Sequence, residues 1–173
     1  MSYTTILVPL CFLFSIGCYC QSDSLTVTNN LIEDYLELAD KHLVDKKLDE
    51  VFKYTELADL EILKSSNRYS LNRIKAWDLR GKAYYYKQAY NEASIALEKA
   101  IDIYDKSQLE VSDYILELFN NLGTIQQGNG DFDKGLVNFK KALELRKEMS
   151  DDPSPDLASR LSKAASSFQY TQL

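Results

Sequence analysis

The sequence predicts an all-α fold made of antiparallel pairs of helices. From Asn29 onward the apolar residues recur at the spacing of one helical face, and no long segment alternates with the two-residue period of a strand. Short breaks rich in Gly, Pro, Asn, Asp and Ser separate segments of about 15 to 22 residues. The breaks lie at residues 45–47, 65–67, 88–89, 107–108, 128–130 and 151–153. They predict about seven helices in hairpin order.

The composition fits one globular domain and argues against two classes of partner. The chain has 173 residues, of which 45% are apolar and 27% are charged. Its formal net charge is −6, and its acidic and basic residues are mixed along the helices without a basic run. Nucleic acid and anionic membrane surfaces attract proteins through such runs. We therefore expect no nucleic-acid partner, and contact with a membrane only through the N-terminal segment.

Residues 1–20 have the pattern of a signal peptide. The apolar run from Ile6 to Cys20 is shorter than the about 20 apolar residues of a membrane-spanning helix, but its length suits a signal-peptide core. Cys18 and Cys20 place small side chains at positions −3 and −1 before Gln21, where a signal peptidase requires them. We therefore expect cleavage before Gln21 and an exported protein, either periplasmic or secreted.

Two other outcomes stay open for this segment. Ser15-Ile16-Gly17-Cys18 resembles a bacterial lipobox, in which Cys18 would carry a lipid anchor. An uncleaved apolar run would itself hold the chain at the membrane. Because Cys11, Cys18 and Cys20 are the only cysteines of the sequence, cleavage before Gln21 removes every thiol. Disulfides and cysteine metal sites are then excluded together.

Beyond a short linker at residues 21–28, the chain repeats itself. A shift of 42 residues places small residues on small residues and aromatic residues on aromatic ones. The aligned sets include Ala39, Gly81 and Gly123; Ala58, Ala100 and Ala142; and Tyr35, Trp77 and Phe119. The predicted units lie near residues 32–73, 74–115 and 116–153.

The middle unit carries the most complete motif. It reads Trp77-x-x-Arg80-Gly81-x-x-Tyr84 and then Ala93-x-x-x-Leu97-x-x-Ala100. This pattern resembles the tetratricopeptide repeat (TPR), with Arg80 and Leu97 in place of the usual Leu and Phe. The third unit has Gln126 where Tyr is usual and Gly135 where Ala is usual, and the first unit has Val51 and Thr55 at the small and aromatic positions.

The resemblance covers residues 29–173 and implies the architecture of a TPR domain. That architecture is a right-handed superhelical solenoid of antiparallel helix pairs, here with about three TPR units and a C-terminal capping helix. Small residues are needed where the two helices of a pair cross, since a larger side chain would hold their axes too far apart. We expect the capping helix at residues 154–173, with Ser154 as N-cap, Pro155 at the first helical position and an apolar stripe at Leu157, Leu161 and Phe168.

The resemblance also implies a function. TPR domains bind proteins or peptides in a concave groove, so we expect an interaction module that is not an enzyme and has no cofactor. The unit of 42 rather than about 34 residues resembles kinesin light chains and the periplasmic TPR region of bacterial sensor proteins. An alternative is therefore the N-terminal sensor fragment of a signalling protein such as a histidine kinase. Self-association of the chain stays open.

The first helix of each TPR unit lines the groove in this family. Carried onto this sequence, the lining positions of the second and third units are Lys75, Asp78, Lys82, Tyr85, Tyr86, Glu117, Asn120, Thr124 and Gln127. The first unit contributes Glu33, Leu36, Asp40 and Leu43. Tyr85 and Tyr86 are the strongest candidates, because exposed neighbouring tyrosines are typical contact residues. Asp78 and Lys82 replace the Lys and Asn of the carboxylate clamp found in some TPR domains, which argues against that class of ligand.

Neither a catalytic nor a metal site is expected. His42, the one histidine, occupies an aromatic position of the repeat, which favours a packed side chain. Residues Asn129 to Asp133 resemble a calcium loop, but Lys134 stands where Gly is required and Lys140 where the bidentate Glu belongs. We interpret this segment as a turn that ends in an N-cap at Asp131.

Overall fold

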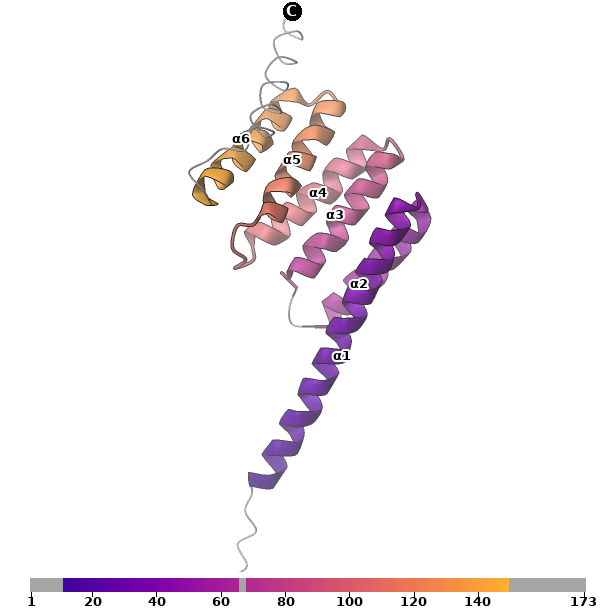
Figure 1. The fold of residues 1–173 in the computed structure, drawn as a ribbon, viewed down its shortest axis with the longest axis vertical. Helices are drawn as coiled ribbons and strands as arrows, with labels where there is room; N and C mark the ends of the chain where they lie inside the picture. The colour runs from indigo at the N-terminus through magenta and orange to yellow at the C-terminus, as the bar shows by residue number, and fades with distance from the viewer. Residues whose placement is uncertain (1–10, 66–67, 150–173) are drawn as a thin grey trace, which may run out of the picture.

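The computed structural model describes residues 11–65 and 68–149, with side chains from Thr28 onward. This part of the chain contains six helices and no strand (Figure 1). They are α1 (Cys11–Val44), α2 (Leu48–Lys64), α3 (Leu71–Tyr86), α4 (Tyr90–Asp105), α5 (Asp113–Gly128) and α6 (Phe132–Met149). The all-α prediction is confirmed. The expected capping helix, residues 154–173, lies outside the described residues.

The six helices form three hairpins that stack side by side. Helix α1 packs on α2, α3 on α4 and α5 on α6, while α2 packs on α3 and α4 on α5 (Figure 1). The second helices begin at Leu48, Tyr90 and Phe132, at equal intervals of 42 residues. Each is preceded by a turn with one residue of positive φ: Lys46 at 59°, Gln88 at 60° and Gly130 at 88°. The same left-handed turn therefore closes all three hairpins.

Helix α1 is longer than the sequence suggests. It begins at Cys11 and runs without a break through residues 21–28, where we expect a short linker. Its N-terminal half extends well beyond the other helices (Figure 1). The segment from Cys18 to Val44 contains neither Gly nor Pro, so nothing in its sequence interrupts the helix. The expected cleavage position before Gln21 lies within α1. Among the described residues, no helix has both the length and the apolar character that crossing a bilayer requires.

The core consists of two clusters that meet at α3. One joins α1, α2 and α3 around Ala39, Val51 and Ile62, and the other joins α3 to α6 around Leu97, Ile115 and Leu122. The prediction of small residues at the crossings is confirmed. A Cβ atom on Gly81 would lie 2.8 Å from Leu97 Cδ2, and one on Gly123 would lie 2.9 Å from Phe139 Cε1. Both distances are shorter than normal carbon contacts.

Two departures from the TPR motif compensate each other. Arg80 stands where Leu is usual, and Thr55 stands at an aromatic position. Arg80 Nε donates a hydrogen bond of 3.0 Å to Thr55 Oγ1, which in turn donates to the Val51 carbonyl at 2.8 Å. The guanidinium carbon also lies 4.3 Å from the centre of the Trp77 ring. Burial lowers the pKa of Arg80, and the acceptor on Thr55 satisfies part of its hydrogen-bonding capacity inside the protein.

Gln126, a third departure from the TPR motif, is also accommodated by hydrogen bonds to other helices. This side chain is only 2% exposed, in the position where Tyr is usual. Its Nε2 donates to Glu98 Oε1 at 3.2 Å, and its Oε1 accepts from Asn138 Nδ2 at 2.7 Å. The amide thus links α4, α5 and α6 through hydrogen bonds, where a tyrosine would fill the space with a ring.

Candidate functional site

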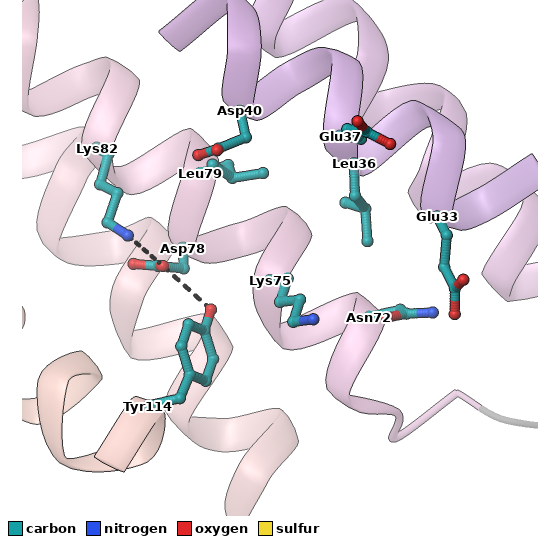
Figure 2. A pocket seen from close by; sticks show the side chains of 10 residues that line it. All are labelled: Glu33, Leu36, Glu37, Asp40, Asn72, Lys75, Asp78, Leu79, Lys82 and Tyr114. Carbon is teal, nitrogen blue, oxygen red and sulfur yellow. Dashed lines mark hydrogen bonds and ion pairs between the residues drawn. The ribbon is translucent and has the colours of Figure 1, made fainter. Parts of the chain in front are cut away.

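Two pockets follow each other along the face where α1, α3 and α5 lie. The first, which we call the N-terminal pocket, has a volume of about 480 Å³ (Figure 2). It is lined by Glu33, Leu36, Glu37 and Asp40 of α1, by Asn72, Lys75, Asp78, Leu79 and Lys82 of α3, and by Tyr114 of α5. The second, the central pocket, has a volume of about 490 Å³. It is lined by Lys82, Tyr85, Tyr86, Leu97, Asn121, Thr124, Ile125, Gln127 and Phe139. Because Lys82 lines both, we describe the two pockets together as the groove.

Asp78 is the fixed centre of the N-terminal pocket. Its side chain is 4% exposed, and its Oδ2 accepts hydrogen bonds from Lys82 Nζ at 2.8 Å and from the Tyr114 hydroxyl at 3.0 Å (Figure 2). Burial, reinforced by the charge of Asp78, raises the pKa of Tyr114 far above that of an exposed tyrosine. Tyr114 therefore remains a proton donor and ties the start of α5 to the middle of α3.

The central pocket has an aromatic wall and an apolar floor. Tyr85 and Tyr86 are 40% and 49% exposed, whereas Leu97 and Phe139, which line the same pocket, are almost fully buried. The Tyr85 ring lies edge-on to Tyr90, with 5.8 Å between the ring centres. Lys46 Nζ lies 3.0 Å from the centre of the Tyr86 ring. Such exposed rings offer a large contact area at little cost in side-chain entropy.

Most of the residues predicted for the groove line it. From the second and third units, the pockets bring together Lys75, Asp78, Lys82, Tyr85, Tyr86, Thr124 and Gln127, and from the first unit they add Glu33, Leu36 and Asp40. Three predicted residues do not line either pocket. Leu43 is a core residue that is 7% exposed, and Glu117 and Asn120 lie on α5 between Tyr114 and the central pocket. Contact of any of these residues with a partner stays a prediction.

The structure adds residues that the repeat pattern misses. Glu37 lies one turn after Glu33 and one turn before Asp40, so helical spacing alone could have indicated it. Tyr114 precedes the part of α5 that matches the repeat, and its contact with Asp78 joins residues 36 positions apart in the sequence. No local pattern reports such a contact, because it depends on how two hairpins pack.

His42 and the calcium-loop-like segment, considered above as possible sites, are part of the packing and turns of the fold. His42 is stacked on Tyr54, with ring centres 5.4 Å apart and planes at 7°. Residues 129–131 form the turn before α6, where Asn129 Nδ2 donates to Asp131 Oδ2 at 3.2 Å and Gly130 has positive φ. Across the residues that the structure describes, no group of three or more His, Cys, Asp or Glu side chains is placed to hold a metal ion.

The fold is similar to that of solved structures of proteins from several organisms. BtubC from P. vanneervenii superposes with a TM-score of 0.68 at 20% identity, covering 82% of this chain and 59% of that one. The TPR2AB domain of yeast Sti1, solved as a complex with pHSP90, gives 0.66 at 17% identity and covers 83% of this chain and 50% of that one. A TPR-like protein of Chlorobium tepidum, CT2138, gives 0.60 at 14% identity and covers 86% and 98%. The chain thus spans between half and three fifths of the first two structures.

The sequence itself matches one family. No protein with a curated description shows significant sequence similarity to the chain. The sequence model of the tetratricopeptide repeat matches residues 74–107 and 116–149, which correspond to the hairpins α3–α4 and α5–α6. The matched segments begin at the unit boundaries expected from the sequence, and α3 and α5 begin three residues earlier. Residues 74–107 and 116–149 are therefore tetratricopeptide repeats, and the described part of the chain has the all-α fold of a TPR solenoid.

Proposed function

We propose that this chain is an exported interaction module that holds an extended peptide segment, or a segment of a protein subunit, in the groove. The observation that carries the proposal is the continuity of the two pockets along α1, α3 and α5. An extended chain laid along them would place successive side chains into separate pockets, which is how peptide-binding domains obtain specificity.

The chemistry of the groove supports a polypeptide over a small anionic ligand. The central pocket combines exposed tyrosine rings with amide and hydroxyl groups, a mixture typical of protein interfaces. Lys82 is engaged with Asp78, so its charge is not free to clamp a carboxylate. The proposed partner therefore differs in chemistry from a ligand that is recognised through its C-terminal carboxylate.

Photocrosslinking tests the groove as the binding surface. A photoreactive phenylalanine analogue at Thr124 should capture a partner in cells that express the protein, whereas the same analogue at Glu92, which is exposed and outside both pockets, should not. Tyr85→Ala with Tyr86→Ala should abolish the Thr124 crosslink while leaving helicity and the melting temperature nearly unchanged. A crosslink that survives the double substitution, or that forms equally from position 92, contradicts the proposal.

Export is tested separately. The apolar run from Ile6 to Cys20 and the small residues before Gln21 motivate it. The intact mass of the protein recovered from its native compartment should correspond to a chain that begins at Gln21 or at a lipidated Cys18. A full-length chain that begins at Met1 in the cytoplasm would overturn the proposal of export without affecting that of the groove.

The sensor-fragment alternative uses the same groove for a different purpose. In that case ligand binding would be relayed to a signalling domain on a neighbouring protein or on a longer chain. Neighbouring genes that encode a histidine kinase or response regulator would favour it over a free-standing module.

A further inference from the structure

We propose that the N-terminal pocket binds a basic side chain, an arginine or a lysine, of the polypeptide that occupies the groove; the inference rests on the proposed function. Three acidic side chains of α1 form one wall of this pocket. Glu33, Glu37 and Asp40 are separated by four and three positions, so they lie along one face of the helix (Figure 2). All three are exposed, and they form no hydrogen bond or ion pair within residues 28–65 and 68–149.

The pocket also contains an incompletely satisfied buried carboxylate. Asp78 Oδ2 has two donors, but Oδ1 is buried and has no hydrogen-bond partner among the described residues. A buried carboxylate oxygen without a donor is unfavourable, and such groups in native proteins usually find one. This unpaired oxygen belongs to a side chain that lines the pocket, and it is an observation independent of the acidic wall on α1. Because Oδ1 itself is covered, a ligand would supply its donor by way of a small rotation of the Asp78 carboxylate.

The balance of charge selects a cation. Four carboxylates line the pocket, those of Glu33, Glu37, Asp40 and Asp78, against the two ammonium groups of Lys75 and Lys82. Lys82 is already paired with Asp78, whereas Lys75 forms no ion pair with the α1 wall. The pocket therefore has an excess of negative charge, and its partly enclosed shape concentrates the resulting potential.

The apolar lining selects the shape of that cation. Leu36 of α1 and Leu79 of α3, each 7% exposed, line the same pocket as the acidic wall and Asp78. Arginine and lysine carry their charge at the end of an aliphatic stem that can lie on such a surface. A guanidinium group has five donors and can engage two carboxylates at once. A metal ion would make no use of the leucines, and an anionic side chain would be repelled.

Titration with blocked tripeptides tests the inference. The full chain, labelled with ¹⁵N, is titrated with acetyl-Gly-Arg-Gly-amide and, as controls, with the Gln and Glu analogues of the same length. The arginine peptide should shift backbone amides of residues 33–40 and 72–82, and the other two peptides should not. Glu33→Gln with Glu37→Gln should weaken binding by about fivefold or more. Glu92→Gln with Glu148→Gln changes the net charge equally outside both pockets and should leave the affinity unchanged.

The outcomes separate this inference from the proposed function. If the arginine peptide shifts no residue of the N-terminal pocket, or if both double variants weaken it equally, the basic-side-chain inference is wrong. The photocrosslink from Thr124 in the central pocket is independent of that result. A crosslink that depends on Tyr85 and Tyr86, together with no arginine binding, would retain the groove and reject its proposed ligand.

Discussion

Gly135 and Gly123 meet at the crossing of α5 and α6. A Cβ atom on Gly135 would lie 2.8 Å from the carbonyl oxygen of Gly123, which is backbone and cannot move independently. A Cβ on Gly128 would have no neighbour closer than 3.8 Å. Gly135→Ala should therefore lower the free energy of unfolding by about 1 to 3 kcal/mol through overpacking, partly offset by the better helix propensity of Ala.

Gly128→Ala is the matched control in the neighbouring helix. It adds the same methyl group at an ordinary van der Waals distance from Tyr90 and should be neutral or stabilising by up to about 1 kcal/mol. Urea unfolding of both variants measures the difference. Equal effects of the two substitutions would show that α5 and α6 are not in such close contact.

Tyr114 should make stability depend on pH in the alkaline range. Its pKa is raised in the folded protein and lies near 10 in the unfolded chain. The stabilisation is therefore complete below about pH 10 and is lost above it, by up to about 1.4 kcal/mol per pH unit, as the unfolded chain releases the proton. Tyr114→Phe removes both the hydrogen bond to Asp78 and this titration.

The comparison is made between pH 8 and pH 11. At pH 8 the wild-type chain should be more stable than Tyr114→Phe, because the hydroxyl donates to a buried carboxylate. The difference should shrink towards pH 11. The exposed Tyr69, changed to Phe, serves as the control for general alkaline effects. A stability difference for Tyr114→Phe that stays constant with pH would show that the hydroxyl is not held in the folded protein.

Residue-level features were only partly predictable from the sequence. The glycines at the crossings followed from the repeat pattern, since Gly81 and Gly123 align with Ala39. Gly135 and Gln126 looked like departures from the motif. Their reasons, the Gly123 carbonyl and the amide network with Glu98 and Asn138, lie on other helices and leave no local signal.

At the level of elements, the contact between α2 and α3 depends on a polar pair. Thr55→Val should lower the free energy of unfolding by about 1 to 3 kcal/mol, because Arg80 Nε loses its acceptor inside the protein. Arg80→Leu restores the residue usual in the TPR motif and should remove that penalty when combined with Thr55→Val. Chemical unfolding of the two single variants and the double variant forms a thermodynamic cycle.

The cycle should give a coupling energy of about 0.5 to 3 kcal/mol, the range for residues that share a hydrogen bond. Arg80→Lys is the charge-conserving control, and it should not rescue Thr55→Val. Additive effects in the cycle would mean that Arg80 and Thr55 act independently, and the two departures from the motif would then be unrelated.

The boundaries of most elements followed from the breaks in the sequence, and one did not. The turns at residues 45–47, 88–89 and 128–130 were placed correctly, because each separates two helices of matching apolar period. The start of α1, by contrast, was placed incorrectly. A signal-peptide pattern followed by polar residues suggests a linker, but residues 21–28 lack a helix-breaking residue and continue the helix.

At the level of the whole molecule, the repeat pattern predicted which face forms the groove. A 42-residue period places equivalent positions of α1, α3 and α5 on the same side of the array. Those of α1 and α3 line the N-terminal pocket, and those of α3 and α5 line the central pocket. The depth and charge of the pockets could not be predicted in the same way. They depend on Tyr114, whose contact with Asp78 exists only after the hairpins have packed. The pairing of Lys82 with Asp78, by contrast, lies within α3 at a spacing of four residues, which the sequence alone could have indicated.

The end of the array leads to the last prediction. Residues 154–173 lie outside the described part of the chain, and their sequence predicts a capping helix with apolar Leu157, Leu161 and Phe168 on one side. A repeat array needs a terminal helix with a polar outer face to cover its last hairpin. Truncation after Asp152 should therefore lower the melting temperature by several degrees, as the loss of about 1 kcal/mol or more would do in a domain of this size. It should also promote self-association through the uncovered face of α5 and α6.

Point substitutions in the full-length chain separate capping from a general effect of shortening. Leu161→Asp with Phe168→Asp places two charges on the apolar stripe and should reproduce the lower melting temperature of the truncated chain. Ser162→Asp with Ser166→Asp adds the same charges on the polar side and should change it little. Light scattering and thermal unfolding provide the two measurements. Residues 154–173 do not cap the array if the truncated chain stays monomeric with an unchanged melting curve. The same conclusion follows if both pairs of substitutions act alike, because burial against the last hairpin would make the two sides of the helix unequal.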